Sequence, residues 1–229
     1  MTSTFTYGTN GKDRIEDISK GNTNQNIYTY GGDDYIKGGN GNDYINAGSG
    51  NDIIGVFRGD NIVDGGSGVD LISLGFAKDG NNYNGVTIDL GRMGWQDTGE
   101  SWLKVKNVEQ AMGGPGDDVI IGNTKTNTLY GGDFGGNDWL DGGRGGYDVL
   151  FGGDGEDTFV MNKGKGYATV TDYSFDDDWI YFKGNSRRLG LYDSGNDAEL
   201  WNGNDLVGVF NGAAGSELVK DGGGYFYLA

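Results

Sequence analysis

The fold is decided by the stretch Gly38-Gly39-Asn40-Gly41-Asn42-Asp43-Tyr44-Ile45-Asn46, whose pattern of residue types is repeated by the next nine residues, Ala47 to Gly55. The period of nine extends in both directions from these two copies. Its eighth position is always apolar and reads Ile27, Ile36, Ile45, Ile54, Val63 and Ile72, and its sixth position reads Gln25, Asp34, Asp43, Asp52, Asn61 and Asp70. A short motif in strict register indicates a repeat architecture with one structural unit per period.

A second block follows the same rule, with small insertions. It begins at Gly113-Gly114-Pro115-Gly116-Asp117-Asp118 and ends at Gly152-Gly153-Asp154-Gly155-Glu156-Asp157-Thr158-Phe159-Val160. Between them the polar and apolar positions recur as Asn127 with Leu129, Asp138 with Leu140, and Asp148 with Leu150. One further copy, Gly8 to Glu16, opens the chain, so the repeat covers most of residues 8 to 160.

Each repeat predicts one short strand and one tight turn. Three residues centred on the apolar eighth position are too few for a helix, but they suffice for a strand whose central side chain points inward. Glycines at positions one, two and four permit the positive φ angles that a tight turn requires. Two repeats then form one coil of about eighteen residues, and successive coils stack by parallel strand pairing. We therefore expect an all-β solenoid.

Composition limits the chemistry of this chain. It contains no His and no Cys, which excludes imidazole and thiolate ligands and the usual Ser-His-Asp and Cys-His nucleophiles. Lys and Arg number 17 against 34 Asp and Glu, and the resulting net charge of −17 opposes binding to nucleic acid and to anionic lipid. No run of about 18 apolar residues is present that could span a bilayer. Oxygen ligands remain, and they suit hard cations, above all calcium.

The aspartates of stacked turns would lie about 4.8 Å apart. Two like charges at about 5 Å repel by roughly 1 to 3 kcal/mol, depending on the effective dielectric constant. A cation between the turns would relieve this repulsion. Carboxylates from two stacked turns and the turn carbonyls together offer about six hard oxygens, the set that calcium prefers.

These motifs resemble the RTX calcium-binding repeats, whose consensus is Gly-Gly-x-Gly-x-Asp-x-apolar-x. The resemblance implies a right-handed parallel β-roll that binds several calcium ions. It also implies that an ion lies between a turn and the turn two repeats later. One ion would use Gly48, Gly50, Asp52, Gly65, Ser67 and Asp70, and another would use Tyr30, Gly32, Asp34, Ala47, Ser49 and Asp52.

The expected metal ligands comprise one acidic set and one set of turn residues. The acidic side chains are Asp34, Asp43, Asp52, Asp70, Asp118, Asp138, Asp148 and Asp157. The turn residues are Tyr30, Gly32, Gly39, Gly41, Ala47, Gly48, Ser49, Gly50, Gly65, Ser67, Gly114, Gly116, Gly136, Gly152 and Asp154.

Alternating turns fall on opposite edges of the roll, and the two edges differ in charge. The strong edge carries Asp34, Asp52 and Asp70 in the first block, and Asp118, Asp138 and Asp157 in the second. The weak edge carries Gln25, Asp43 and Asn61, then Asn127 and Asp148, with the departures Thr23, Arg58 and Lys125 nearby. We expect the strong edge to bind calcium well and the weak edge poorly, because amide oxygens are neutral ligands.

The chain divides into four predicted regions: residues 1–73 with the first block, 74–112 as an irregular insertion that continues the roll, 113–160 with the second block, and 161–229 as a C-terminal antiparallel β cap. The insertion holds Trp95 and Trp102, which either pack over the junction or present a sugar-stacking platform. From Met161 the alternating apolar pattern predicts a meander with hairpin turns, which would cover the open last coil.

The expected cellular location and role of the protein follow from the resemblance. Residues Met1 to Asn10 lack the pattern of a cleaved secretory signal. RTX proteins are exported by type I secretion machinery through an uncleaved C-terminal signal, and Tyr225-Phe226-Tyr227-Leu228-Ala229 fits its apolar end. We therefore expect a secreted, extracellular or bacterial cell-surface module that folds when it meets calcium and is not itself an enzyme.

Two other functions stay open at this point. One is an adhesin, lectin-like or surface-coat role, in which Trp95, Trp102 or the loop Asn81 to Asn84 contacts glycans or other copies of the protein. The other is a carbohydrate-active enzyme that uses Asp97 and Glu100 as acid and base, although two carboxylates three residues apart are common without catalysis.

Overall fold

The computed structural model describes residues 3–16, 23–74, 84–99, 101–132 and 135–229. The chain separates into two compact units, Met1–Gly114 and Pro115–Ala229, and each is considered by itself. In the described residues the regular structure is β-strand apart from one 3-10 helix, η1 (Ser186–Arg188). The all-β prediction is confirmed.

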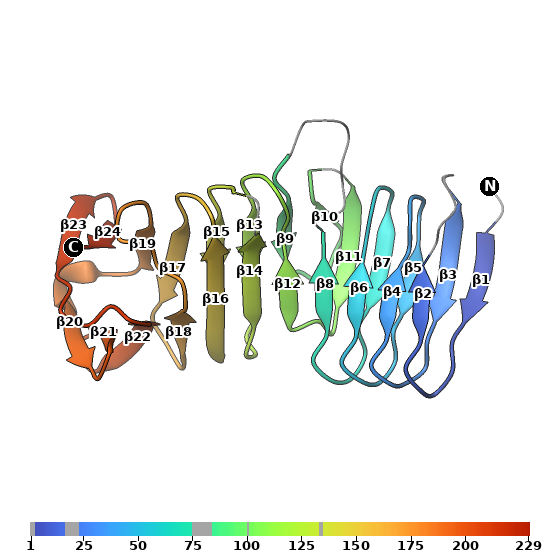
Figure 1. The fold of residues 1–229 in the computed structure, drawn as a ribbon, viewed down its shortest axis with the longest axis horizontal. Helices are drawn as coiled ribbons and strands as arrows, with labels where there is room; N and C mark the ends of the chain where they lie inside the picture. The colour runs from blue at the N-terminus through green and yellow to red at the C-terminus, as the bar shows by residue number, and fades with distance from the viewer. Residues whose placement is uncertain (1–2, 17–22, 75–83, 100, 133–134) are drawn as a thin grey trace. The chain divides into compact units, whose positions relative to one another are not determined.

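The first unit is built from strands that alternate between two sheets as the chain advances. One sheet has the order β1 (Ser3–Tyr7), β3 (Asn24–Tyr28), β5 (Tyr44–Asn46), β7 (Asn61–Asp64), β11 (Trp102–Lys106) and β10 (Gln96–Asp97). The other contains β2 (Arg14–Glu16), β4 (Tyr35–Lys37), β6 (Ile53–Gly55), β8 (Leu71–Ser73) and β12 (Gln110–Met112); β9 is Thr87–Asp89. Figure 1 shows β4, β6 and β8 side by side, and they pair in parallel. This arrangement is the predicted parallel β-roll.

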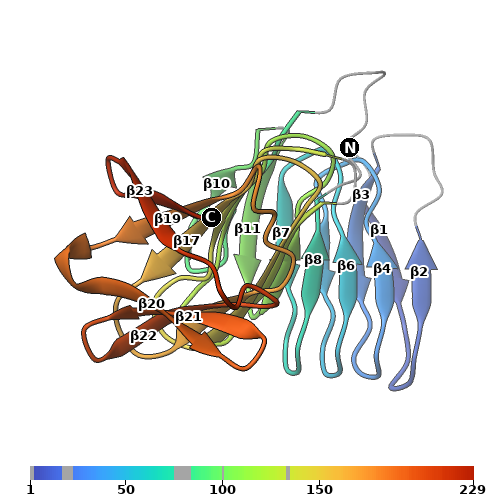
Figure 2. The same cartoon turned by 60° about the vertical axis from the view of Figure 1, so that its left-hand side comes forward.

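The second unit repeats the plan and ends in antiparallel strands. One of its layers contains β13 (Val119–Ile121), β15 (Trp139–Asp141), β17 (Thr158–Asn162), β19 (Trp179–Lys183), β24 (Tyr225–Leu228) and β23 (Leu218–Gly222). The other contains β14 (Thr128–Gly132), β16 (Tyr147–Gly153), β18 (Tyr167–Val170), β22 (Asp205–Phe210), β21 (Asp197–Asn202) and β20 (Leu189–Ser194). Figure 2 shows β20, β21 and β22 together as an antiparallel sheet, as predicted for the cap.

The core of each roll is a column of eighth-position side chains. Ile36, Ile54 and Ile72 are partners in the parallel register and are fully buried. Leu140 and Phe159 hold the same place in the second unit. Burying one such side chain stabilises the fold by about 1.5–3 kcal/mol, so each coil adds a similar increment to the stability of the column.

The start of the antiparallel region differs from the prediction. The sequence predicted a meander of hairpins from Met161, but β18 pairs in parallel with β16, and β19 pairs in parallel with β17. A strand of the roll needs an inward apolar side chain and a backbone partner. Val170 in β18 and Ile180 in β19 are these inward side chains, and both are fully buried. Residues 171–178, between β18 and β19, contain no glycine, so the turn glycines of the repeat are not required at that step. The hairpins that follow begin with β20 and β21.

Candidate metal centre

Sixth-position carboxylates join successive coils on the strong edge. Asp52 Oδ1 accepts a hydrogen bond from the backbone N–H of Asp34 at 2.8 Å, and Asp70 Oδ1 accepts one from the N–H of Asp52 at 2.9 Å. Asp138 and Asp157 repeat this arrangement in the second unit. Each bond occupies one carboxylate oxygen and leaves the other facing the carboxylate's own turn.

A second set of side-chain bonds runs in the opposite direction along the fifth positions. Asp33 Oδ1 accepts from the N–H of Asn51 at 2.8 Å, and Asn51 Oδ1 in turn accepts from the N–H of Val69 at 2.8 Å. Each turn is therefore bonded to the coil before it and to the coil after it. The sequence analysis missed this role, although Asn and Asp at the fifth position were a visible signal.

The turns stack too closely for most side chains. Gly50 has φ 131°, and a Cβ added there would lie 2.1 Å from the carbonyl oxygen of Gly32. Its N–H donates to the carbonyl of Ser67 at 2.9 Å. Tyr30 departs from the consensus, because it occupies a second position with φ 65°. Left-handed backbone at a residue with a Cβ costs roughly 1–2 kcal/mol.

Turns on the two edges differ in what the sixth residue does for its own turn. On the weak edge, the Asn61 side-chain amide donates to the carbonyls of Phe57 at 3.0 Å and Gly59 at 3.2 Å. These carbonyls belong to the second and fourth residues of the turn. On the strong edge Asp52 holds the equivalent position, and its buried Oδ2 has no hydrogen-bond partner among the described residues. An oxygen therefore stands where Asn61 places two N–H groups, and a cation satisfies that oxygen and the turn carbonyls together.

Buried carboxylates elsewhere show the same need for positive charge. Asp34 and Asp157 are almost fully buried, and their Oδ2 atoms also lack a hydrogen-bond partner within the described part of the chain. Burial, reinforced by neighbouring carboxylates, raises the pKa of Asp52 to about 6, of Asp138 to about 8 and of Asp157 to about 7. At these three positions the protein alone does not stabilise the charged form of the acid.

Backbone oxygens must complete any metal site here. Within the described residues no group of three or more acidic side chains lies close enough to hold a metal ion. The expected turn carbonyls are present. That of Gly48 accepts a backbone hydrogen bond from Ser67, and that of Tyr30 accepts from both the N–H and the hydroxyl of Ser49, at 3.0 Å and 3.5 Å. A carbonyl oxygen has two lone pairs, so one remains for a cation at Gly48. The donor set fits calcium, which prefers six to eight oxygens of mixed kind.

The remaining predicted ligands lie in turns of the same design. Gly39 and Gly41 have φ 81° and 128°, and Gly116 has φ 109°. Gly114 ends the first unit. Gly136 donates its N–H to the carbonyl of Asp154 at 3.1 Å, and a Cβ at Gly152 would lie 2.1 Å from Asp157 Oδ2. These positions and the functional difference between the two edges stay predictions.

On the weak edge the acids also tie coils together. Asp43 Oδ1 accepts from the N–H of Gln25 at 2.8 Å, and Asp148 Oδ1 accepts from that of Asn127 at 2.9 Å. Burial raises the pKa of Asp148 to about 7. Burial therefore disfavours the charged form of Asp148, as it does for Asp52, Asp138 and Asp157 on the strong edge.

The sequence analysis missed Asp178, which continues the strong-edge ladder beyond the repeats. Its Oδ1 accepts from the N–H of Asp157 at 2.9 Å, and its Oδ2 accepts from the N–H of Ser174 at 2.7 Å. Burial raises its pKa to about 6. The spacing of Asp178 and Ile180 matches that of Asp157 and Phe159, and this was the signal that could have identified it.

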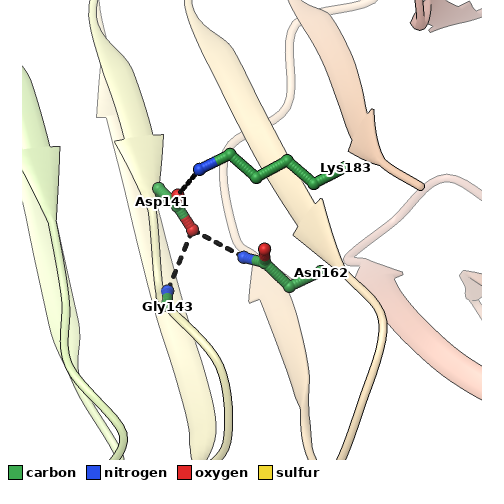
Figure 3. Close-up of polar contacts among 4 residues, drawn as sticks. All are labelled: Asp141, Gly143, Asn162 and Lys183. Carbon is green, nitrogen blue, oxygen red and sulfur yellow. Dashed lines mark hydrogen bonds and ion pairs between the residues drawn. The ribbon is translucent and has the colours of Figure 1, made fainter.

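In two places a lysine supplies the positive charge. Asp141, at a ninth position, is buried and bonds to Lys183 Nζ at 2.5 Å, Asn162 Nδ2 at 2.6 Å and Gly143 N at 3.0 Å (Figure 3). Asp64, also at a ninth position, is bound by Lys106 Nζ at 2.7 Å and by the Asn107 amide at 2.8 Å. These carboxylates need no metal.

The alternative surface sites are only partly described. Trp95 and Trp102 are 41% and 49% exposed, and Trp102 lies opposite Asp97 in the β10–β11 pair. Glu100 and residues 81–83 lie outside the described residues. The enzymatic pair Asp97 and Glu100 therefore has no described geometry.

Residues 21–54, 58–82, 112–146 and 134–165 match the family model of the RTX calcium-binding nonapeptide repeat, in four copies. These segments are RTX calcium-binding repeats. RTX repeats bind calcium at several sites, and the ladder of buried carboxylates lies within the matched segments. In the described residues no helix is long and apolar enough to cross a membrane.

No match is found among curated proteins. Among solved structures, this chain is similar to the extracellular lipase LipA from Serratia marcescens, with 20% identity and a TM-score of 0.32. The alignment covers 87% of this chain and 40% of the lipase, so the chain spans less than half of that protein's length.

Proposed function

We propose that this chain is an RTX module that stays largely unfolded without calcium and folds when it meets extracellular calcium after export. The observation that carries the proposal is the contrast between Asn61 and Asp52. The Asn61 amide satisfies the carbonyls of its own turn, whereas Asp52 places a buried, unpartnered oxygen at the equivalent point. The strong-edge turn therefore requires a bound cation that the weak-edge turn replaces with an amide.

The residues that would hold calcium around Asp52 are its own Oδ2, the carbonyls of Gly48 and Gly50, and the facing turn with Gly65, Ser67 and Asp70. Bound there, calcium supplies positive charge between carboxylates that otherwise repel. Without it, the charged ladder and the ordering of a chain with 48 glycines both oppose folding. Binding and folding are then one event, as in other proteins whose site is absent from the unfolded state.

The biological role follows from this coupling. A chain that stays unfolded where calcium is scarce can pass through type I secretion machinery, and it can then fold outside the cell. We place the protein in the extracellular space or on a bacterial surface. Its role there is structural rather than catalytic.

A calcium titration followed by far-UV circular dichroism tests the proposal. The full-length chain is first equilibrated with excess chelator and then titrated with calcium, and a parallel titration with magnesium serves as the control. We expect a cooperative gain of β-sheet signal with calcium and little with magnesium, which resists mixed, irregular oxygen sites. A full β-sheet signal in chelator that calcium leaves unchanged would overturn the proposal.

A further inference from the structure

The cap carries an open pocket on the outward face of its edge hairpin. The pocket has a volume of ≈ 420 Å³ and is lined by Tyr192, Trp201, Gly203 and Asn204. It lies on β20 and β21 and on the turn that follows β21, away from the carboxylate ladders of the repeats. Its volume falls within the range of about 300–1,000 Å³ that is typical of small-molecule sites.

The strand register places two aromatic side chains on the same face of the hairpin. Tyr192 lies opposite Glu199, and Gly190 lies opposite Trp201, so all four residues project to the same side of the hairpin. Tyr192 is 62% exposed. Its ring leans over Gly190, where an added Cβ would lie 3.1 Å from the ring. The missing side chain at Gly190 therefore leaves room for the Tyr192 ring over the position opposite Trp201.

The pocket is held in place before any ligand arrives. The Trp201 indole Nε1 donates to Glu199 Oε2 at 3.0 Å, which fixes the plane of the ring. The N–H of Gly203 donates to the carbonyl of Arg188 in η1 at 3.0 Å, which anchors the turn that forms one wall. A preformed site loses less entropy on binding.

Charges of both signs lie near the pocket, which leaves a neutral ligand as the class that needs no charged partner. Glu199 lies beside the rings and opposes anions, and the chain as a whole carries a net charge of −17. The Arg188 side chain reaches the Gly203 wall, where its Nη1 would lie 3.9 Å from an added Cβ, and its charge opposes a quaternary ammonium ligand. Two aromatic faces, one carboxylate and the Asn204 amide remain as recognition groups.

We propose that this pocket binds a neutral saccharide. One face of a pyranose ring presents C–H groups that pack on Trp201 and Tyr192, and the hydroxyl groups at its edge bond to Glu199 and Asn204. This chemistry uses the apolar body and polar neighbours of an aromatic site together. The protein would thus attach to glycans through its cap while its repeats bind calcium.

Isothermal titration calorimetry on the calcium-loaded full chain tests the proposal. The neutral ligands are cellobiose, maltose, xylobiose and N,N′-diacetylchitobiose, and choline and glucuronate serve as charged probes. We expect at least one neutral disaccharide to bind. Trp201→Ala and Tyr192→Ala should each weaken that binding by about tenfold or more. Gly190→Ala should weaken it by displacing the Tyr192 ring, without removing any group that contacts the sugar.

Tyr147→Ala is the matched control, since Tyr147 is 64% exposed on the roll and distant in sequence from the hairpin. It should leave saccharide affinity unchanged. Calcium midpoints measured by circular dichroism should agree among all variants, which excludes misfolding. Absence of binding to all four disaccharides, tighter binding of choline or glucuronate, or equal affinity in Trp201→Ala would each overturn the proposal.

Discussion

The ammonium of Lys183 lies 2.5 Å from the buried carboxylate of Asp141, which it reaches from β19, two strands away in the same layer. Asp141 sits in the repeat that also carries Asp138, yet it is neutralised by the protein itself. The lysine joins β19 to β15 and supplies the positive charge that we propose calcium supplies on the strong edge.

Replacing Lys183 with Met should destabilise the calcium-saturated protein by about 1–3 kcal/mol, because Asp141 would remain buried with only amide donors. Urea unfolding at saturating calcium measures the change. Lys163→Met serves as the control, since Lys163 is exposed in a turn, and it should have little effect. Equal stability of the two variants would show that the ion pair contributes nothing.

Asp52→Asn should reduce the number of bound calcium ions while leaving the coil-to-coil bond intact. The amide retains an oxygen that can accept from Asp34, and its N–H groups can bond to the carbonyls of Gly48 and Gly50 as those of Asn61 do in its own turn. We expect a higher residual β-sheet signal in chelator and less cooperative calcium binding. Calcium-binding stoichiometry and circular dichroism check both points.

The reciprocal change, Asn61→Asp, should place an unsatisfied carboxylate on the weak edge. The metal-free chain should become harder to fold, and its calcium dependence should become steeper. Asn61→Ala is the matched control, because it removes the amide without adding charge. If Asn61→Asp and Asn61→Ala behave alike, the correspondence between amide and cation is wrong.

Tyr173 joins the cap to the end of the carboxylate ladder. Its hydroxyl donates to the carbonyl of Asp178 at 2.8 Å and accepts from the N–H of Leu228 at 3.1 Å. Tyr173→Phe should cost about 1–2 kcal/mol at pH 8, because two buried backbone groups lose their partner. Thermal or urea unfolding measures this difference against the wild type.

Ionisation of Tyr173 makes the stability of the folded protein fall as the pH rises. Burial raises the pKa of Tyr173 from 10.0 to about 12, so the stability it confers is complete below pH 10 and is lost as the pH rises through 12. At pH 11 the ionisable wild type has lost roughly 1.4 kcal/mol, and its advantage over Tyr173→Phe should largely disappear. A gap of constant size from pH 8 to 11 would contradict this.

Truncation after Gly224 should impair folding as well as any export function. The removed residues form β24, which pairs with both β19 and β23 and buries Phe226 and Leu228. We expect the truncated chain to need more calcium to fold and to associate through the exposed edge of β19. Calcium titrations and sedimentation velocity check these outcomes, and a monomer with an unchanged midpoint would argue against them.

The sequence predicted the roll well because the eighth position of every repeat is the apolar side chain that points into the core. Every eighth-position residue from Ile27 to Ile72 is buried, and the turns lie between strands as the glycines required. The candidate acids were also identified, since a carboxylate two residues before an inward apolar side chain is visible without a structure.

What the sequence did not reveal depends on contacts between distant segments. Asp178 follows a segment, residues 171–177, that has no glycine turn, so its spacing from Ile180 was the one sequence signal, and its bond to Asp157 established its place in the ladder. The bond between Lys183 and Asp141 joins residues 42 apart, outside any repeat spacing. The continuation of parallel pairing past Val160 had a partial signal, since Gly164 and Gly166 form a turn with positive φ before β18, but no glycine marks the turn before β19.

The hydrogen bonds of the fifth-position and sixth-position side chains, which run in opposite directions, also limit how many residues the repeat region can gain or lose. Between residues 25 and 70 their partners are separated by 18 residues, so gain or loss of one 18-residue segment there leaves every donor facing an equivalent acceptor. Loss of nine residues would instead bring strong-edge turns onto weak-edge turns and mix acids with amides. Separations of 19 to 21 in the second unit preserve the same bonds, which shows that extra residues are absorbed elsewhere in the coil. Duplication in pairs of repeats is therefore the step that lengthens this protein without disturbing its chemistry.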